Sequence, residues 1–369
     1  MSFIYSNQLI DFKKEPIFFG TGRNSQRYDN VKYKKFEKLL DSQNGQFWQH
    51  NEVNVVKDQA DFQFLTEAEK HVFTRTLNKL IFLDSVQGRG MLQTFGTVIS
   101  DPMFEAMVTA WQHFECTIHS RSYTHILQSI YPNPGDIFDE SFKIAELTEL
   151  AEDISTQYEN CFNAVTRFNL NQNSLEDTKE KILRLILEIN ILEGIRFYSG
   201  FASIWAMGEL GKMERTGLIL DLICRDENLH LAMTQNLLKI LEKNEDEGFT
   251  KTYKKLKPEI PKIYERAAEQ EFLWIDYLFS KGSFLGLTPD LAKSYIKYLT
   301  NRRLKAIGEK IIFEGFNSNP FPWVDKHISS DSSETLPQEN EIINYRDDIL
   351  SMSIDDNDIL KLKKKFKIN

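Results

Sequence analysis

The sequence has few cysteines and no stretch that is long and apolar enough to span a membrane. Its three cysteines, Cys116, Cys161 and Cys224, are too few and too scattered over 369 residues for a disulfide framework or a cysteine-based zinc site. No uninterrupted apolar run approaches the ~18 residues of a membrane helix. The N-terminus also lacks the basic start and apolar run of a secretory signal. We therefore expect a cytoplasmic protein that does not associate with membranes.

Positive charge is also in deficit. The 45 Lys and Arg residues are outnumbered by 54 Asp and Glu residues, which gives a net charge of −9 at pH 7. Nucleic-acid-binding domains carry a basic excess that releases counterions from the phosphates, so we expect no nucleic-acid partner. The hydrophobic share of 41% and the aromatic share of 12% exclude global disorder.

The distribution of residues along the chain predicts helices. Glycine and proline are sparse, and the prolines stand at segment edges, as in long helices joined by short turns. Thr66 and Glu69 have the spacing of a capping box, and Asp101 followed by Pro102 predicts a second helix that ends before Pro132. Further helical patterns cover residues 139–168, 175–208, 212–243, 250–281, with a bend at Pro258 and Pro261, and 289–307.

No linker rich in glycine or serine divides these helices. We therefore expect one all-α domain over residues 1–329, with irregular stretches in its first 60 residues that wrap over the bundle. Residues 330–369 are polar and charged, and we interpret them as a flexible C-terminal tail that can dock a partner.

Ionisable residues lie inside the apolar faces of four of the predicted helices. Asp84 follows three apolar residues, Glu193 stands among isoleucines and a leucine, and His230 lies between two leucines. A buried carboxylate without a partner costs several kcal/mol, so each needs a cation, a hydrogen-bond network or a metal nearby.

The arrangement repeats. A lone carboxylate on one helix is followed, on the next, by a glutamate and a histidine one turn apart. The residues are Asp84 with Glu115 and His119 in the first half, and Glu193 with Glu227 and His230 in the second. Each residue alone could be an ordinary core or surface group, but a four-helix bundle builds a dinuclear carboxylate site from two such sets. Carboxylate-rich ligation with two imidazoles favours iron or manganese over copper or structural zinc.

Tyr123 lies four residues after His119 and shares its helix face. Its ring should therefore face the same interior one turn further along. The simpler interpretation is a core tyrosine that donates to a backbone carbonyl.

Four strings of residues resemble the radical-generating small subunit of class I ribonucleotide reductase. They are residues 83–89, 117–126, 192–198 and 225–231, and the similarity extends from residues 15–20 to 337–339. The resemblance implies a ferritin-like fold, usually dimeric, with two metal ions held by Asp84, Glu115, His119, Glu193, Glu227 and His230. It also implies that oxygen reacts with the reduced diiron centre and leaves a one-electron hole on Tyr123. Iron is the default, but these ligands do not distinguish it from manganese.

By the same resemblance, the radical passes to a separate large subunit that binds the ribonucleotide. Trp48 would relay it, with Asp226 hydrogen-bonded between the indole and His119, and Tyr345 in the tail would hand it across the subunit interface. Residues 350–369 would form the docking peptide. Without the resemblance, Trp48 reads as a core aromatic and Tyr345 as a tail residue without a role. Asp226 can also orient a ligand histidine, and the two roles are compatible.

The spacing departs from the family pattern at one point. The family has glutamate three residues before the first ligand histidine, whereas here Cys116 occupies that position and Glu115 stands four before His119. One extra residue after Trp111 can be absorbed as a π-bulge, which leaves Glu115 facing the metals. The rival interpretation turns the Cys116 thiol to the metals, and His113 is a third candidate.

Two other functions remain open at this stage. A different ferritin-like diiron oxidase or hydroxylase would act on a small molecule through an open channel, and an iron-storage bundle would form large shells. Neither has a use for Trp48, Asp226 and Tyr345 together.

Overall fold

The computed structural model describes residues 4–328, and these residues form the expected all-α bundle. Within that span there is no β-strand, only two isolated bridges. The segment interpreted as a tail, residues 330–369 with Tyr345, lies outside the described residues.

The first half of the chain runs through α1 (Lys34–Gly45), α2 (Val56–Phe64), α3 (Glu67–Phe95), α4 (Pro102–His113), the π-helical turn η1 (Phe114–His119), α5 (Ser120–Ile130), α6 (Pro134–Ser141) and α7 (Ala145–Asn169). The second half runs through α8 (Leu175–Ile191), a second π-helical turn η2 (Leu192–Arg196), α9 (Phe197–Gly208), α10 (Glu214–Lys243), α11 (Thr250–Leu256), α12 (Ile260–Leu278), α13 (Pro289–Ala306) and α14 (Asp325–Ile328). Short 3₁₀ turns lie at Glu245–Glu247, Lys257–Glu259 and Pro322–Val324.

Two helix starts follow directly from the sequence. At α3 the Thr66 hydroxyl accepts from the Glu69 N–H at 3.3 Å, and the Glu69 carboxylate accepts from the Thr66 N–H at 2.8 Å. At α4 the Asp101 carboxylate accepts from the Phe104 N–H at 2.7 Å, with Pro102 in the first turn. Both caps bind backbone N–H groups that have no partner inside the helix, so the predicted starts are confirmed.

Two sequence expectations need correction. The pattern at 139–168 is two helices, α6 and α7, because Asn78 of α3 fixes the end of α6: its amide donates to the Ile137 carbonyl at 3.1 Å and to the Ser141 hydroxyl at 2.5 Å. The first 60 residues also contain more helix than expected. α1 packs on α4 and α10 and buries Phe36, a contact that its short apolar pattern did not reveal.

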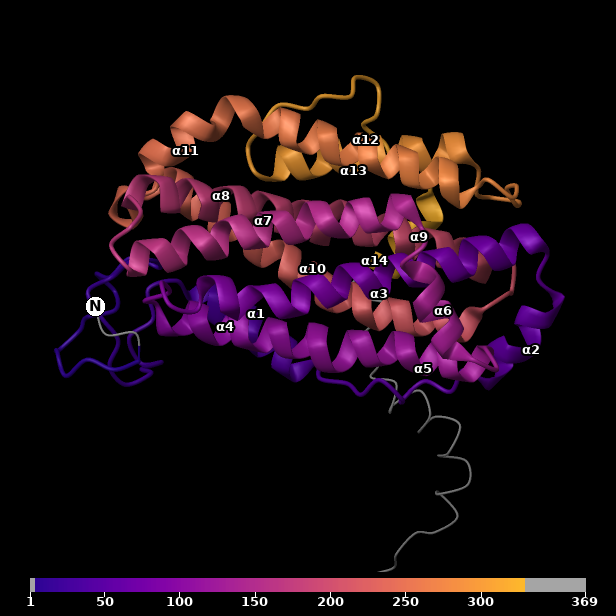
Figure 1. The fold of residues 1–369 in the computed structure, drawn as a ribbon, viewed down its shortest axis with the longest axis horizontal. Coiled ribbons are helices and arrows are strands. Elements are labelled where there is room, and N and C mark those ends of the chain that lie inside the picture. Colours follow the sequence, from indigo (N-terminus) through magenta and orange to yellow (C-terminus); the bar gives the residue numbers. More distant parts are fainter. Residues whose placement is uncertain (1–3, 329–369) are drawn as a thin grey trace, which may run out of the picture.

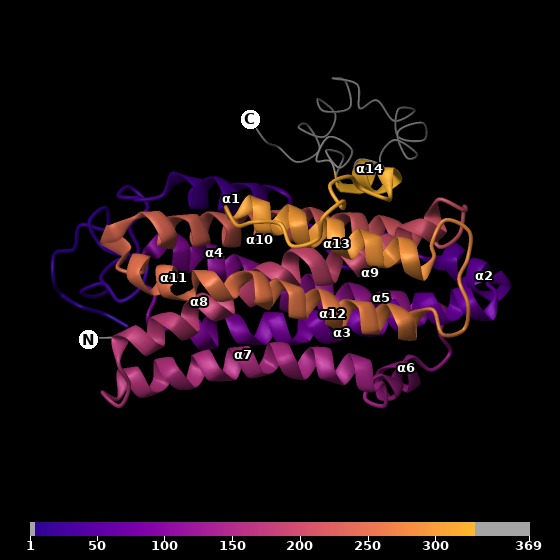
Figure 2. The ribbon, with the colours of Figure 1, turned by 90° about the horizontal axis from the view of Figure 1, so that it is seen from above.

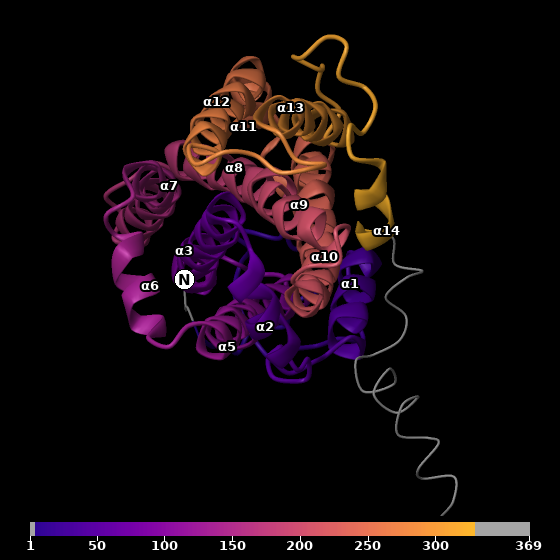
Figure 3. The ribbon, with the colours of Figure 1, turned by 90° about the vertical axis from the view of Figure 1, so that its right-hand side faces the viewer.

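Four helical segments surround the middle of the bundle, as the end-on view shows (Figure 3). They are α3, the continuous run α4–η1–α5, the continuous run α8–η2–α9, and α10. In the side view α12 and α13 lie together over α8 and α9 (Figure 1), and the view from above places α7 beside α3 and α8 (Figure 2). The outer helices therefore shield the inward faces of the four central segments from water.

None of the helices described for residues 4–328 combines the length and the apolar character needed to cross a membrane.

Candidate metal centre

The four central segments bring six ionisable side chains into the middle of the bundle. α3 supplies Asp84, η1 supplies Glu115 and His119, η2 supplies Glu193, and α10 supplies Glu227 and His230. All six side chains are fully buried. The structure therefore gathers every residue that the repeated sequence pattern singled out.

The six residues form two overlapping groups. The first is Asp84, Glu115, His119 and Glu227, and the second is Glu115, Glu193, Glu227 and His230. Within each group the possible ligand atoms lie within 4.8 Å of one another. Glu115 and Glu227 belong to both groups, so the two groups share these two carboxylates.

Several atoms of the cluster have no hydrogen-bond partner among the described residues. They are both carboxylate oxygens of Asp84, Glu115 Oε2, His119 Nδ1, Glu193 Oε2 and Glu227 Oε1; His119 Nδ1 has carboxylate oxygens at 3.1 and 3.4 Å, but these contacts are not aligned as hydrogen bonds. Each buried polar atom left without a partner costs about 1–3 kcal/mol, and a charged one costs more. Oxygen and imidazole donors with free lone pairs, turned toward one another, fit a pair of divalent ions of the iron or manganese type.

The same crowding shifts the protonation of these groups. Burial, together with neighbouring carboxylates, raises the pKa of Asp84 and of Glu193 well above the usual range. Burial opposes ionisation of Glu115 as well, but hydrogen bonds with His119 and His230 outweigh it and lower the Glu115 pKa. Without metal, the centre therefore holds protons that a cation would replace.

The two histidines show the complementary shift. Burial alone would lower their pKa values, but the carboxylates around them raise the pKa of His119 well above normal and also raise that of His230. His230 Nδ1 lies 2.8 Å from Glu227 Oε2, and His119 Nδ1 lies 3.1 Å from Glu227 Oε1. In both rings it is therefore Nδ1 that faces the glutamates of the cluster.

The extra residue that the sequence contains before His119 lies in η1. Residues Phe114–His119 form a π-turn, and both the N–H and the hydroxyl of Ser120 donate to the Glu115 carbonyl, the hydroxyl at 2.8 Å. The turn keeps Glu115 buried in the centre. Cys116 points outward, its thiol 3.0 Å from the Gly88 carbonyl, and His113 lies at the surface against the Phe47 ring. The π-bulge expected from the sequence is thus present, and Cys116 and His113 do not join the cluster.

Sequence reasoning missed three side chains that hold the ligands. Gln87 donates to Glu193 at 2.6 Å and accepts from the Tyr158 hydroxyl, while the Trp111 indole donates to Glu115 at 2.8 Å. The amide of Gln43 lies 2.7 Å from His230 Nε2.

Two of these three contacts had a sequence signal. Gln87 lies one turn after Asp84 on the same helix face, and Trp111 lies four residues before Glu115, so both inward positions could have been found. Gln43 reaches the centre from α1, and nothing in its local sequence indicates that contact.

Tyr123 is fully buried one turn after His119, as its spacing indicated. Burial, followed by the negative charge of Asp84, raises its pKa well above the usual range. Its hydroxyl has no hydrogen-bond partner among the described residues. The alternative of a core tyrosine bonded to a backbone carbonyl is therefore not what the structure shows.

Trp48 lies in the segment after α1 and is also fully buried. Its indole N–H donates to Asp226 Oδ2 at 2.8 Å, and the same oxygen lies 3.1 Å from His119 Nε2. A continuous hydrogen-bonded path of three side chains thus joins the indole to the cluster. Asp226 also fixes the orientation of the His119 ring, the usual second role of a carboxylate beside a ligand histidine.

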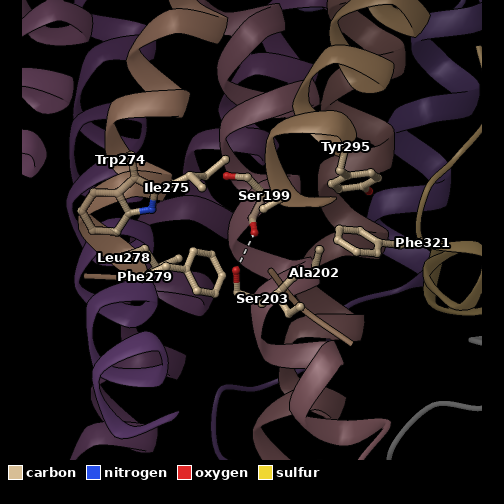
Figure 4. Close-up of a pocket in the computed structure, with 11 residues that line it drawn as sticks. Ser199, Ala202, Ser203, Trp274, Ile275, Leu278, Phe279, Tyr295 and Phe321 are labelled. Atoms are coloured by element: carbon tan, nitrogen blue, oxygen red, sulfur yellow. Dashed lines mark hydrogen bonds between the residues drawn. The ribbon is translucent and has the colours of Figure 1, made fainter. Parts of the chain in front are cut away.

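Two cavities lie away from the cluster. The first, between α9, α12 and α13, has a volume of about 10 Å³, room for about one water. Figure 4 shows it walled by apolar rings, with the Ser203 hydroxyl donating to the Ser199 carbonyl. The second, of about 360 Å³, lies beside α14 and is lined mainly by charged and polar residues. None of the six clustered residues lines either cavity.

Comparison with known proteins gives concordant matches. The family model described as ribonucleotide reductase, small chain, matches residues 26–320. The chain is 40% identical over 354 residues to the ribonucleoside-diphosphate reductase subunit beta of Buchnera aphidicola subsp. Schizaphis graminum, covering 92% of each. It is 37% identical over 368 residues to ribonucleoside-diphosphate reductase 1 subunit beta of Escherichia coli O157:H7, covering 96% of this chain and 97% of that one.

The fold is similar to that of the ribonucleotide reductase R2 subunit from Clostridium botulinum, with a TM-score of 0.75 and 29% identity. That match covers 85% of this chain and 94% of the other. It confirms the ferritin-like fold class expected from the sequence. The span matched by the family model contains all six clustered residues, Tyr123 and the Trp48 path.

Proposed function

The chain belongs to the ribonucleotide reductase small-chain family, and we propose that its buried centre holds two metal ions and generates a radical on Tyr123. The enzyme concerned is ribonucleoside-diphosphate reductase of class I. The observation that carries the proposal is the cluster of six buried ligand side chains whose unpartnered atoms face one another. Apart from metal binding, such an arrangement would be strongly destabilising.

The ligands of the two ions would be the two groups described above, with Glu115 and Glu227 shared. Iron is our default, and manganese fits the same oxygen and nitrogen donors. When bound and reduced, the metal pair would react with oxygen and supply a one-electron oxidant. The protein's part is to place the carboxylates around the ions, orient both imidazoles and keep bulk water out.

Tyr123 would be the residue oxidised. A phenol that loses an electron also loses its proton, so an acceptor must be close. Asp84 is the carboxylate with the largest effect on the Tyr123 pKa, and we assign it as the group that receives the proton on the protein side. Full burial of the ring keeps solvent from quenching the radical.

Trp48, Asp226 and His119 would relay the radical toward the partner subunit. When Trp48 is oxidised, its indole proton can move 2.8 Å to Asp226 and return when the ring is reduced. Tyr345, outside the described residues, would be the next member. We also propose a homodimer in the cytoplasm that docks the large subunit through its last residues.

A diiron oxidase or hydroxylase acting directly on a small molecule is not favoured. Such an enzyme needs a substrate cavity that opens on the ligands, and neither of the two cavities described above does so. Such an oxidase or hydroxylase would also not require the hydrogen-bonded path from Trp48 to His119.

The relay is tested with Trp48→Phe beside Trp205→Phe as the matched control. Both indoles are fully buried, but Trp205 stacks on His327 and is not part of the path from Trp48 to His119. We expect the Trp48 variant to form the Tyr123 radical normally and to reduce nucleotides, with the large subunit present, at least about 100-fold more slowly. The control should retain both functions. Wild-type nucleotide reduction by the Trp48 variant would remove this residue from the mechanism.

A further inference from the structure

Arg303 of α13 is a buried cation without an obvious counter-ion. The residue is only 5% exposed, and the ionisable neighbours that act on it among residues 4–328 are tyrosines, a cysteine and Arg302 rather than a carboxylate. Taking a guanidinium out of water without an anion is costly, so its remaining contacts must compensate. These contacts are with the segments that carry the residues of the metal centre.

The first contact is with η2, the π-turn that carries Glu193. Arg303 Nε donates to the Gly194 carbonyl at 2.8 Å. A π-turn shifts the backbone hydrogen bonds away from the regular i→i+4 ladder, and here a side chain from another helix supplies a donor inside it. A Cβ atom on Gly194 would lie 2.8 Å from Arg303 Nε and 2.9 Å from a Leu231 methyl, so only glycine allows this approach.

The second contact is with Tyr198, five residues after Glu193. The Arg303 guanidinium lies 4.8 Å from the centre of the Tyr198 ring, a cation–π contact. The Tyr198 hydroxyl in turn donates to the side-chain oxygen of Asn228. Asn228 stands on α10 between Glu227 and His230, so this chain of contacts joins the two segments that carry three of the clustered residues.

We propose that Arg303, Tyr198 and Asn228 act as a clamp that sets the position of η2 relative to α10. They are positioning residues, because none of them belongs to either ligand group. Glu193 occurs only in the second group, with Glu115, Glu227 and His230, and no residue of η2 occurs in the first. Releasing the clamp should therefore weaken the second metal site and spare the first. The inference rests on the proposed dimetal centre.

The test is Mn(II) binding by the full-length protein, with bound and free ion measured by dialysis and electron paramagnetic resonance. Arg303→Met removes both contacts of the guanidinium, while Tyr198→Phe keeps the ring and removes only the hydroxyl. Arg302→Met is the matched control. Arg302 lies next to Arg303 in the sequence, but it is exposed, and its guanidinium donates to the Tyr298 hydroxyl.

We expect wild type and the Arg302 variant to bind two ions per chain. In the Arg303 and Tyr198 variants one site should weaken about 10–100-fold, as for other residues that support metal ligands, and one should keep its affinity. Arg303→Lys, which retains a donor, should recover part of the loss. If Arg303→Met does not fold, Tyr198→Phe alone decides.

Two results would overturn the clamp: two unchanged sites in both variants, or equal weakening of both sites in parallel with lower thermal stability, which is what a merely structural role predicts. Failure of the wild-type protein to bind any Mn(II) or Fe(II) would instead count against the dimetal centre itself, and with it the clamp.

Discussion

Single residues in the centre depend on one another because they share protons as well as space. The pKa values of Asp84, Glu193, His119 and His230 are all raised, so these groups keep their protons to higher pH in the metal-free centre than they would in water. Metal ligation requires unprotonated carboxylates and neutral imidazoles. Binding of the ions must therefore expel those protons.

We accordingly predict that metal-free protein titrated with Mn(II) at about pH 7 releases protons, and that metal affinity falls as the pH is lowered. The sign follows from raised pKa values: the protonated, non-binding forms gain population as pH decreases. Proton release can be followed with an indicator dye in weak buffer. Uptake without proton release, with an affinity independent of pH from about 5.5 to 7.5, would contradict this description of the centre.

Residue type and spacing alone were enough to single out the six clustered residues, because two lone carboxylates and two helically spaced Glu–His pairs stand inside apolar faces. Residue type and spacing did not reveal the side chains that hold these residues in position. Gln43 and Arg303 come from α1 and α13, and their contacts depend on packing between helices distant in sequence. Such contacts have no local pattern.

At the scale of the element, both glutamate-bearing runs, α4–η1–α5 and α8–η2–α9, contain a π-turn at the ligand. The first turn was predictable because the spacing of Glu115 and His119 differs by one residue from the pattern of the resembled family. The second, at Leu192–Arg196, offered no such irregularity and was missed. A π-turn is visible in sequence only against a reference of known register.

The π-turn η1 predicts the effect of deleting one residue from this helix. Deleting Cys116 should let the turn revert to regular helix, with Glu115 still inward and both metal ions bound, because the bulge contains one residue more than the helix needs. Deleting Leu229 from the regular helix α10 is the control and should abolish metal binding, since no spare residue separates Glu227 from His230. Metal stoichiometry and circular dichroism report the outcome. Loss of both ions in the Cys116 deletion would show that the extra residue is required.

At the scale of the whole molecule, helix order and the central four segments followed from periodicity and caps. Other parts of the fold did not: α1, α2 and the separation of α6 from α7 depend on tertiary contacts such as the Asn78 bonds to α6. The family match adds that this chain is a small subunit, which works with a large subunit.

The division of labour predicts the effect of removing residues 340–369. Radical formation should be intact, because every residue of the centre lies before that segment, while nucleotide reduction with the large subunit should be lost. The radical is measured spectroscopically and the activity by deoxyribonucleotide yield. Loss of both together would refute the docking and relay roles proposed for the tail.

The most direct test of the central claim is electron paramagnetic resonance of the protein loaded with Fe(II) without air and then exposed to oxygen, beside Tyr123→Phe. The account predicts an organic radical in the native protein that is absent from the variant, although both bind two ions. An identical radical signal in the variant would place the unpaired electron elsewhere. Iron binding without any radical in the native protein would contradict the diiron route to a Tyr123 radical.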